Sequence, residues 1–212
     1  MMEADDPRGL AQFIEHMAFN GSTNIPQDQL RPLLQHHGIK MGPDADAFTL
    51  PNKTEYVLDM PGGSDGMIDT ALLVTREFAG NLSFEPAAVD RERSVILGEE
   101  RLRESPAVEA QTDWLNTAFS GQAFATRGNP IGLPDIIKSA TPDALKTFYH
   151  AFYRPELATL VIIGNVDPDN IEARIKAKFS DWQGVGPVGT AAFAPYVPKG
   201  ETTFVRTAPS IP

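Results

Sequence analysis

The 212-residue chain has no cysteine and fewer basic than acidic residues. The absence of cysteine excludes disulfides, thiolate metal sites and thiol nucleophiles, which leaves His, Asp, Glu, Ser and Thr for any chemistry. With 18 Lys and Arg against 28 Asp and Glu, the net charge is -10. Binding to a phosphate backbone requires a basic surface, so we expect no nucleic acid partner.

The sequence also has no hydrophobic run long enough to cross a membrane. The longest run, residues 157–164, is far shorter than the roughly 20 residues of a membrane helix. It is rich in β-branched residues and predicts a buried β-strand. The first residues are polar and acidic and do not form a signal peptide pattern. We expect no membrane span, and the compartment stays open because a cysteine-free chain suits either redox environment.

The composition, with 42% hydrophobic residues, is that of a globular domain with a real core. Hydrophobic periodicity and turn residues predict helices at 9–19, 27–36, 65–81, 86–104, 108–119, 141–152 and 170–179, and strands at 45–49, 55–60, 157–164 and 202–206. These elements do not follow a strict βαβ alternation. The order favours an α+β fold in which a mixed or antiparallel sheet packs against helices.

The residues most informative about chemistry lie on the first predicted helix. Gln12 and His16 are one turn apart, so they share a face with Glu15 beside them. The inverted zincin motif is His-x-x-Glu-His, in which two histidines hold zinc and the glutamate is the base. This chain has Gln-x-x-Glu-His at the same spacing. Taken alone, a single helical histidine of this kind is more often structural than a ligand.

A further ligand would come from a carboxylate elsewhere in the chain. Glu92 and Glu99, on the helix predicted at 86–104, are seven residues apart, which is nearly two turns. Both side chains should face the same way. One of them could ligate a metal while the other orients a neighbouring ligand.

Residues 9–22 resemble the active-site helix of the pitrilysin/insulinase family of zinc metallopeptidases, with Gln12 in place of the first histidine. Later segments resemble landmarks of the same family in the same order. They are an edge hairpin at 42–49 and 54–58, a third-ligand helix at 92–99, and matches at 129–132, 148–155 and 161–167. The resemblance runs from residue 3 to residue 182 and implies a pitrilysin-like α+β sandwich.

The resemblance implies a role for each residue of the motif. It makes His16 and Glu99 zinc ligands, Glu15 the general base on a zinc-bound water, and Glu92 a partner that orients a ligand. Gln12 occupies the position of the first ligand. Its neutral amide is a weaker zinc ligand than imidazole, so we expect zinc to bind weakly or not at all.

The resemblance also implies that a peptide or unfolded protein substrate lies beside the hairpin as an added strand. The residues expected to receive it are Asp46, Ala47 and Thr49. Asp46 stands where the family usually has asparagine, which removes an amide donor and adds charge beside the site.

We expect residues 1–183 to form the metallopeptidase domain. Only about eight residues precede the motif helix, so the first strands of the family fold are expected to be absent from this chain. Residues 184–212 are expected to form a loop-rich segment and a terminal strand leading towards a second domain. The resemblance implies that a C-terminal half or a partner subunit closes over the site.

Two functions follow from these residues. The first is a domain of a zinc metalloendopeptidase that hydrolyses peptide bonds, impaired by Gln12 and inactive as a chain by itself. The second is a noncatalytic subunit of the same fold that binds peptides or scaffolds a complex. The presence of Glu15, His16, Glu92 and Glu99 favours the first, because drift would not be expected to stop at one ligand.

Overall fold

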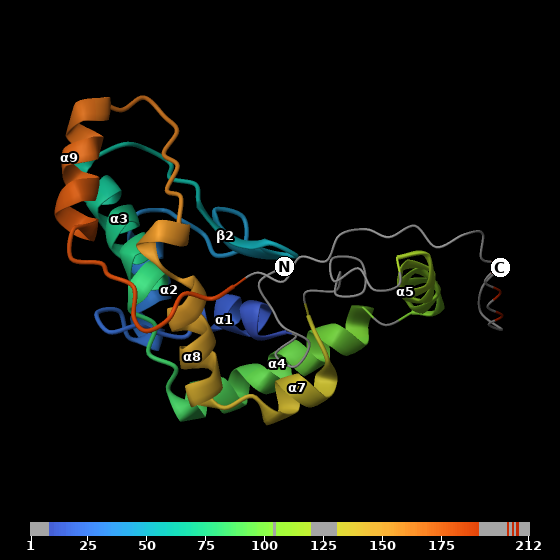
Figure 1. Ribbon diagram of the computed structural model, residues 1–212. Helices are drawn as coiled ribbons and strands as arrows, with labels where there is room; N and C mark the ends of the chain where they lie inside the picture. The colour runs from blue at the N-terminus through green and yellow to red at the C-terminus, as the bar shows by residue number, and fades with distance from the viewer. Residues whose placement is uncertain are drawn as a thin grey trace.

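The computed structural model describes residues 9–103, 105–119 and 131–190, together with residues 203, 205 and 207. Its helices are α1 (Leu10–Ala18), α2 (Gln27–His36), α3 (Asp65–Gly80), α4 (Pro86–Arg103), α5 (Pro106–Ala118), α7 (Pro134–Ser139), α8 (Pro142–Phe152) and α9 (Pro168–Phe179), with a short 3-10 helix η1 (Pro155–Leu157). The strands β1 (Ala45–Leu50) and β2 (Lys53–Leu58) form an antiparallel hairpin (Figure 1). The predicted helices and the hairpin are confirmed, with shifts of a few residues at their ends.

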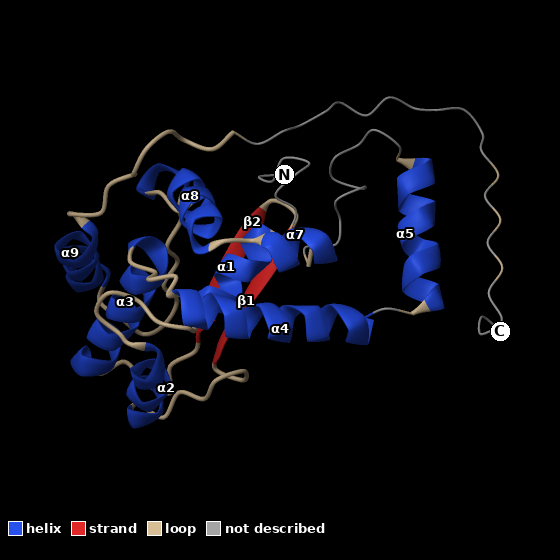
Figure 2. Ribbon diagram, turned by 90° about the horizontal axis from the view of Figure 1, so that it is seen from below, coloured by secondary structure: helices blue, strands red, loops and turns tan. Residues whose placement is uncertain are grey.

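Helix α1 lies in the middle of the molecule, where it packs against α4, α8 and β1 (Figure 2). Its side chains Phe13, Ile14 and Met17 are fully buried because they recur at helical spacing and form one apolar stripe. Gly9 begins the helix with a φ of 105°, and a Cβ there would come within 2.5 Å of the Ile131 carbonyl oxygen. Only glycine fits this backbone, so the start of α1 is fixed against Ile131.

The loop after α1 is held by a buried carboxylate on α3. Glu77 accepts hydrogen bonds from Ser22 Oγ at 2.7 Å, from Asn24 N and Nδ2 at 2.9 and 2.8 Å, and from Asn81 Nδ2 at 2.7 Å. Burial alone would raise the pKa of Glu77, but these hydrogen bonds to its charged form outweigh burial and lower the pKa. The carboxylate therefore joins the C-terminal side of α1 to α3.

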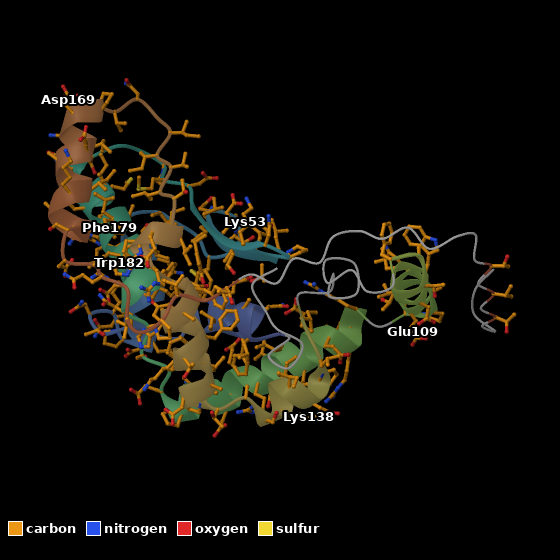
Figure 3. All side chains as sticks on the ribbon, in the orientation of Figure 1. Lys53, Glu109, Lys138, Asp169, Phe179 and Trp182 are labelled. Atoms are coloured by element: carbon orange, nitrogen blue, oxygen red, sulfur yellow. The ribbon has the colours of Figure 1, made fainter. Side chains whose placement is uncertain are left out.

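A second, smaller hydrophobic cluster joins α9 to α3. Its buried members are Ile68 and Leu72 from α3 and Ile171 from α9. This end of the molecule lies away from the tip of the hairpin at Lys53 (Figure 3).

Two of the predicted strands do not appear as strands in the structure. Residues 157–164 begin in η1 and continue without regular structure, with Val161 68% and Ile163 93% exposed. The prediction of a buried strand is wrong here, because burial requires a neighbouring strand and the described residues supply none. Most of the strand predicted at 202–206 lies outside the described residues, and residues 203 and 205 have no regular structure.

In the described part of the chain, the one sheet is two-stranded and packs against helices, an α+β arrangement. It is smaller than the mixed or antiparallel sheet expected from the sequence. No helix among the described residues is long and apolar enough to cross a membrane.

Candidate functional site

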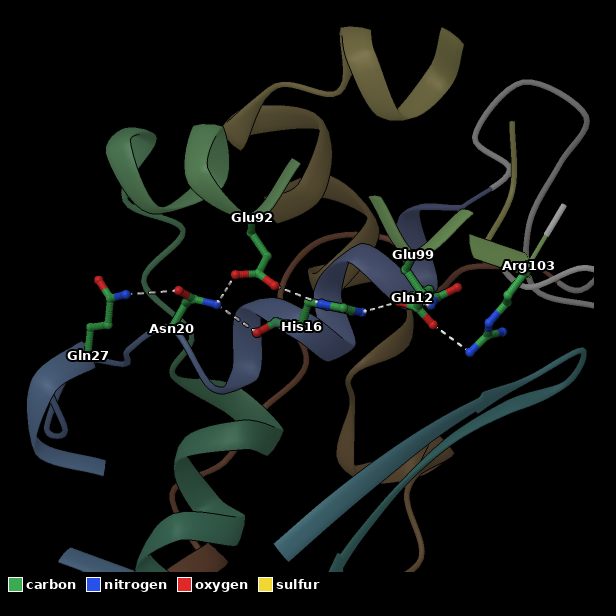
Figure 4. Close-up of polar contacts among 7 residues, drawn as sticks. All are labelled: Gln12, His16, Asn20, Gln27, Glu92, Glu99 and Arg103. Atoms are coloured by element: carbon green, nitrogen blue, oxygen red, sulfur yellow. Dashed lines mark hydrogen bonds and ion pairs between the residues drawn. The ribbon is translucent and has the colours of Figure 1, made fainter. Parts of the chain in front are cut away.

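His16 lies between two carboxylates supplied by α4 (Figure 4). Its Nδ1 is 2.7 Å from Glu92 Oε1, and its Nε2 is 3.3 Å from Glu99 Oε2. Because α1 packs on α4, the seven-residue spacing of the two glutamates brings both carboxylates to the same ring. The predicted convergence of His16 with Glu99 is confirmed as a matter of geometry.

The carboxylates around His16 raise the pKa of its ring. Burial lowers the pKa of His16, but the hydrogen bond and charge of Glu92 and the charges of Glu99 and Glu15 outweigh burial and raise it. Glu92 also accepts a hydrogen bond from Asn20 Nδ2 at 2.8 Å. Burial would raise the pKa of Glu92, yet the hydrogen bonds from His16 and Asn20 lower it overall. The ring orientation of His16 is therefore fixed from its Nδ1 side.

Gln12 is buried in the same cluster, with 5% of its surface exposed. Its Nε2 donates to Glu99 Oε2 at 3.3 Å, while its Oε1 has no hydrogen-bond partner. Leaving a buried acceptor unpaired costs about 1–3 kcal/mol. The amide therefore presents its nitrogen, which cannot ligate a metal, to the carboxylate expected to be a ligand.

This arrangement does not make a complete zinc centre. A catalytic zinc site takes three protein donors, and His16 Nε2 and Glu99 supply two of the expected types. Gln12 does not supply the third, because its oxygen points away from Glu99. Within the described ranges, no group of three or more His, Cys, Asp or Glu is placed to hold a metal ion.

Glu15 lies on the side of α1 that faces the hairpin. Thr49 Oγ1 donates a hydrogen bond to Glu15 Oε2. The pKa of Glu15 is raised, mainly because the carboxyl group is partly buried. The charges of Glu99 and Asp46 raise this pKa further. The Thr49 hydrogen bond and the charge of His16 act in the opposite direction but do not outweigh burial. A partly buried carboxyl group with a raised pKa is suited to accept a proton.

Strand β1 has a free edge beside α1. The N–H of Ala45 donates to Lys40 O at 3.0 Å and its carbonyl accepts from Gly42 N–H at 2.9 Å, so these groups point away from β2. Backbone directions alternate with a period of two in an antiparallel strand, so Ala47 and Thr49 present their groups to the same edge. No other described strand pairs there, and Met41 forms an isolated bridge at Ala45, so the edge is open beyond Ala45. The prediction that 45–49 forms an edge strand beside the motif helix is confirmed.

Two contacts of the site were not predicted from the sequence. Asn20, which marks the end of α1, reaches back to Glu92, and its amide also donates to His16 O at 3.0 Å. Arg103 pairs with Glu99 at 2.5 Å (Figure 4). The i,i+4 spacing of Glu99 and Arg103 on a helix is a signal from which this ion pair could have been found.

Residues 1–134 match the sequence profile of insulinase (peptidase family M16), and residues 139–210 match that of the peptidase M16 inactive domain. The chain is 34% identical over 180 residues to the probable zinc protease PqqL of Haemophilus influenzae, covering 85% of this chain and 19% of that protein. The crystal structure of the periplasmic protease PqqL from Escherichia coli matches with a TM-score of 0.84 at 27% identity, over 92% of this chain and 21% of that chain. The crystal structure of pitrilysin, at 22% identity and a TM-score of 0.66 over 92% of this chain and 20% of that chain, shows the likeness of fold alone.

The chain thus spans about a fifth of the length of these relatives. The predicted pitrilysin-like α+β fold is confirmed. Zinc proteases among the relatives imply zinc as the metal of the family. The matched profile covers more than half of the chain, which therefore belongs to the insulinase family of peptidases, peptidase family M16.

Proposed function

We propose that this chain is a metal-site and peptide-binding domain of a zinc metalloendopeptidase, in which Gln12 weakens metal binding. The observation that carries the proposal is the group formed by Glu15, His16, Glu92 and Glu99 beside the free edge of β1. Three different contacts hold this group in place, from Asn20, Thr49 and Arg103. We would not expect all three contacts to be present if these four residues no longer had a function.

The proposed roles follow from the contacts. His16 Nε2 and the Glu99 carboxylate are the donors available to a metal, and Glu92 orients the His16 ring through Nδ1. Glu15 is the proposed general base, and Thr49 holds its carboxylate towards the hairpin.

The substrate that we propose is a peptide or an unfolded protein segment, bound as an added strand on β1. Main-chain hydrogen bonds to the Ala47 carbonyl and to Thr49 would supply affinity, as in other cases of strand addition, while the Ala47 N–H donates to Asp46 Oδ1. Asp46, next to Ala47, adds a charge to this edge. Because the relatives are about five times longer, we propose that a C-terminal half or a partner subunit completes the enzyme, and that residues 184–212 lead towards it from a domain at 1–183.

One observation favours the noncatalytic alternative. The Gln12 amide nitrogen donates to Glu99, so this carboxylate already has hydrogen-bonding partners within the protein in Gln12 and His16. A peptide-binding or scaffolding subunit would need nothing more from these residues.

Isothermal titration with zinc distinguishes these functions. We expect weak or undetectable zinc binding by the chain as it stands, and stoichiometric binding by Gln12→His, with affinity that falls below about pH 6 as histidines protonate. The control Gln29→His adds a histidine on the exposed face of α2 and should leave zinc binding unchanged. Equal, negligible zinc uptake by the chain and by Gln12→His would favour the noncatalytic subunit.

A further inference from the structure

The hairpin beside the candidate site is acidic. Between residues 44 and 59, one base, Lys53, accompanies four acidic residues, which are Asp44, Asp46, Glu55 and Asp59. Lys53 is already paired with Glu55 at 2.5 Å. Asp46 is exposed on β1, its Oδ1 accepts the N–H of Ala47 at 2.9 Å, and none of the described residues forms an ion pair with it. The carboxylate therefore lies at the outer edge of β1, where it caps the N–H of Ala47.

The adjoining surface of α1 and α4 has the same sign of charge. Glu15 brings a further carboxylate next to β1, where it accepts a hydrogen bond from Thr49 Oγ1. Arg103, the arginine at this cluster, is already paired with Glu99. The buried Gln12 carbonyl oxygen adds an acceptor without a donor. A ligand that brings a positive charge would complement this region.

The exposed face of β1 has a fixed order of side chains. Ala45 and Ala47 are buried, whereas Asp46, Phe48 and Leu50 alternate on the opposite face, with Phe48 51% and Leu50 44% exposed. A strand added at the edge follows the same alternation, and its side chains lie about 5 Å from their neighbours on the same face. Its residues at i, i+2 and i+4 would therefore lie beside Asp46, Phe48 and Leu50.

We propose that the free edge of β1 selects an extended peptide that carries a basic residue beside Asp46 and apolar residues two and four positions away, beside Phe48 and Leu50. The proposal rests on the proposed function, since it needs a peptide on this edge, and it adds the chemistry of that peptide. The preference comes from the exposed carboxylate of Asp46. An acidic residue at the same position would be repelled by Asp46.

The expected selectivity is modest, because Asp46 is exposed. An exposed ion pair changes an equilibrium constant by about two- to fivefold at low salt, and less as salt screens it. Replacing the basic residue by glutamate exchanges attraction for repulsion of similar size, so we expect about a tenfold difference between the two peptides. Replacing it by glutamine should give an intermediate affinity.

Fluorescence anisotropy with the 212-residue chain tests the proposal. The probe is a fluorescein-labelled peptide, Val-Thr-Val-Thr-Arg-Thr-Val-Thr-Val, which presents the same pattern in both chain directions. Matched probes carry glutamine or glutamate in place of arginine, and a fourth probe has N-methylated backbone positions that block strand pairing. We expect affinity to fall from arginine to glutamine to glutamate, and the N-methylated probe not to bind.

Two variants test whether Asp46 causes the preference for the arginine probe. Asp46→Asn should bring the arginine and glutamine probes to within about twofold of each other. Asp169→Asn removes the same charge from α9, at the far end of the molecule from Lys53 (Figure 3), and should keep the full preference. Circular dichroism confirms that both exposed substitutions leave the fold intact.

The probes distinguish peptide binding at the edge from the selectivity of Asp46. If no probe binds, or if the N-methylated probe binds as well as its parent, the peptide edge of the proposed function is wrong and the selectivity falls with it. If all the unmethylated probes bind equally, or if Asp46→Asn leaves the preference for arginine unchanged, peptide binding at the edge stands and the inference about Asp46 is overturned.

Discussion

Glu77→Gln tests how the fold holds α1, the helix on which the candidate site depends. The Glu77 carboxylate is buried and accepts two hydrogen bonds on each oxygen, from Ser22, Asn24 and Asn81. A glutamine has one oxygen and one amide nitrogen, so two of the four donors lose their acceptor whichever way the amide turns. The substitution keeps the shape of the side chain and changes only its hydrogen bonding and charge.

The size of the effect follows from the number of lost contacts. Hydrogen bonds to a charged group contribute about 1.5–3 kcal/mol each, and the Ser22 hydroxyl can rotate to accept from the new amide. We therefore expect Glu77→Gln to lower the free energy of unfolding by about 2–4 kcal/mol. Ser22→Ala, which removes one donor, should cost about 1 kcal/mol and serves as the matched comparison. Urea denaturation followed by circular dichroism measures both values.

The pH dependence of this effect has a definite sign. The pKa of Glu77 lies below its ordinary value of 4.5 in the folded chain, so its stabilising contribution is present above pH 4.5 and is lost as the pH falls through the folded pKa. The difference in stability between the chain and Glu77→Gln should shrink over that acidic range. A loss below about 1 kcal/mol at pH 7, or a difference that grows on acidification, would refute the assigned role of Glu77.

Substitutions at Thr49, Glu92 and Gly9 test further features of the site and of its helix. Thr49→Val should raise the pKa of Glu15 further, because the lost hydrogen bond favours the charged form, whereas Thr49→Ser should leave it unchanged in carboxyl-carbon NMR titrations. Glu92→Gln should lower the pKa of His16, followed by proton NMR of its ring in chelator-treated protein, and an unchanged value would contradict the Nδ1 contact. Gly9→Ala should destabilise the fold by about 1–3 kcal/mol, because alanine rarely adopts the positive φ of residue 9. If thermal unfolding showed no destabilisation, α1 would not depend on this backbone conformation.

The parts of the site that could be predicted from the sequence depend on spacing within single elements. The one-turn spacing of Gln12 and His16, and the two-turn spacing of Glu92 and Glu99, determine which side chains share a face. The hairpin followed from alternating strands around a turn. In each case the geometry is set by a regular backbone, so it holds wherever the element lies in the fold.

The parts that could not be predicted depend on contacts between distant residues. Residues 157–164 have the composition of a buried strand, but their exposure depends on which strand lies beside them. The orientation of the Gln12 amide follows from Glu99 on another helix, and the order of the loop after α1 follows from Glu77. Helix α7, with six residues, was too short to show a clear period.

A crystal structure of Gln12→His grown with zinc, with anomalous scattering measured at the zinc edge, tests the central claim most directly. The account predicts one anomalous peak, bound by the new imidazole, by His16 Nε2 and by Glu99, with Glu92 still on His16 Nδ1. The unsubstituted chain under the same conditions should show no peak, or a weak one, at this position. A zinc peak of full occupancy in the unsubstituted chain, or zinc in the variant bound away from His16 and Glu99, would contradict the account.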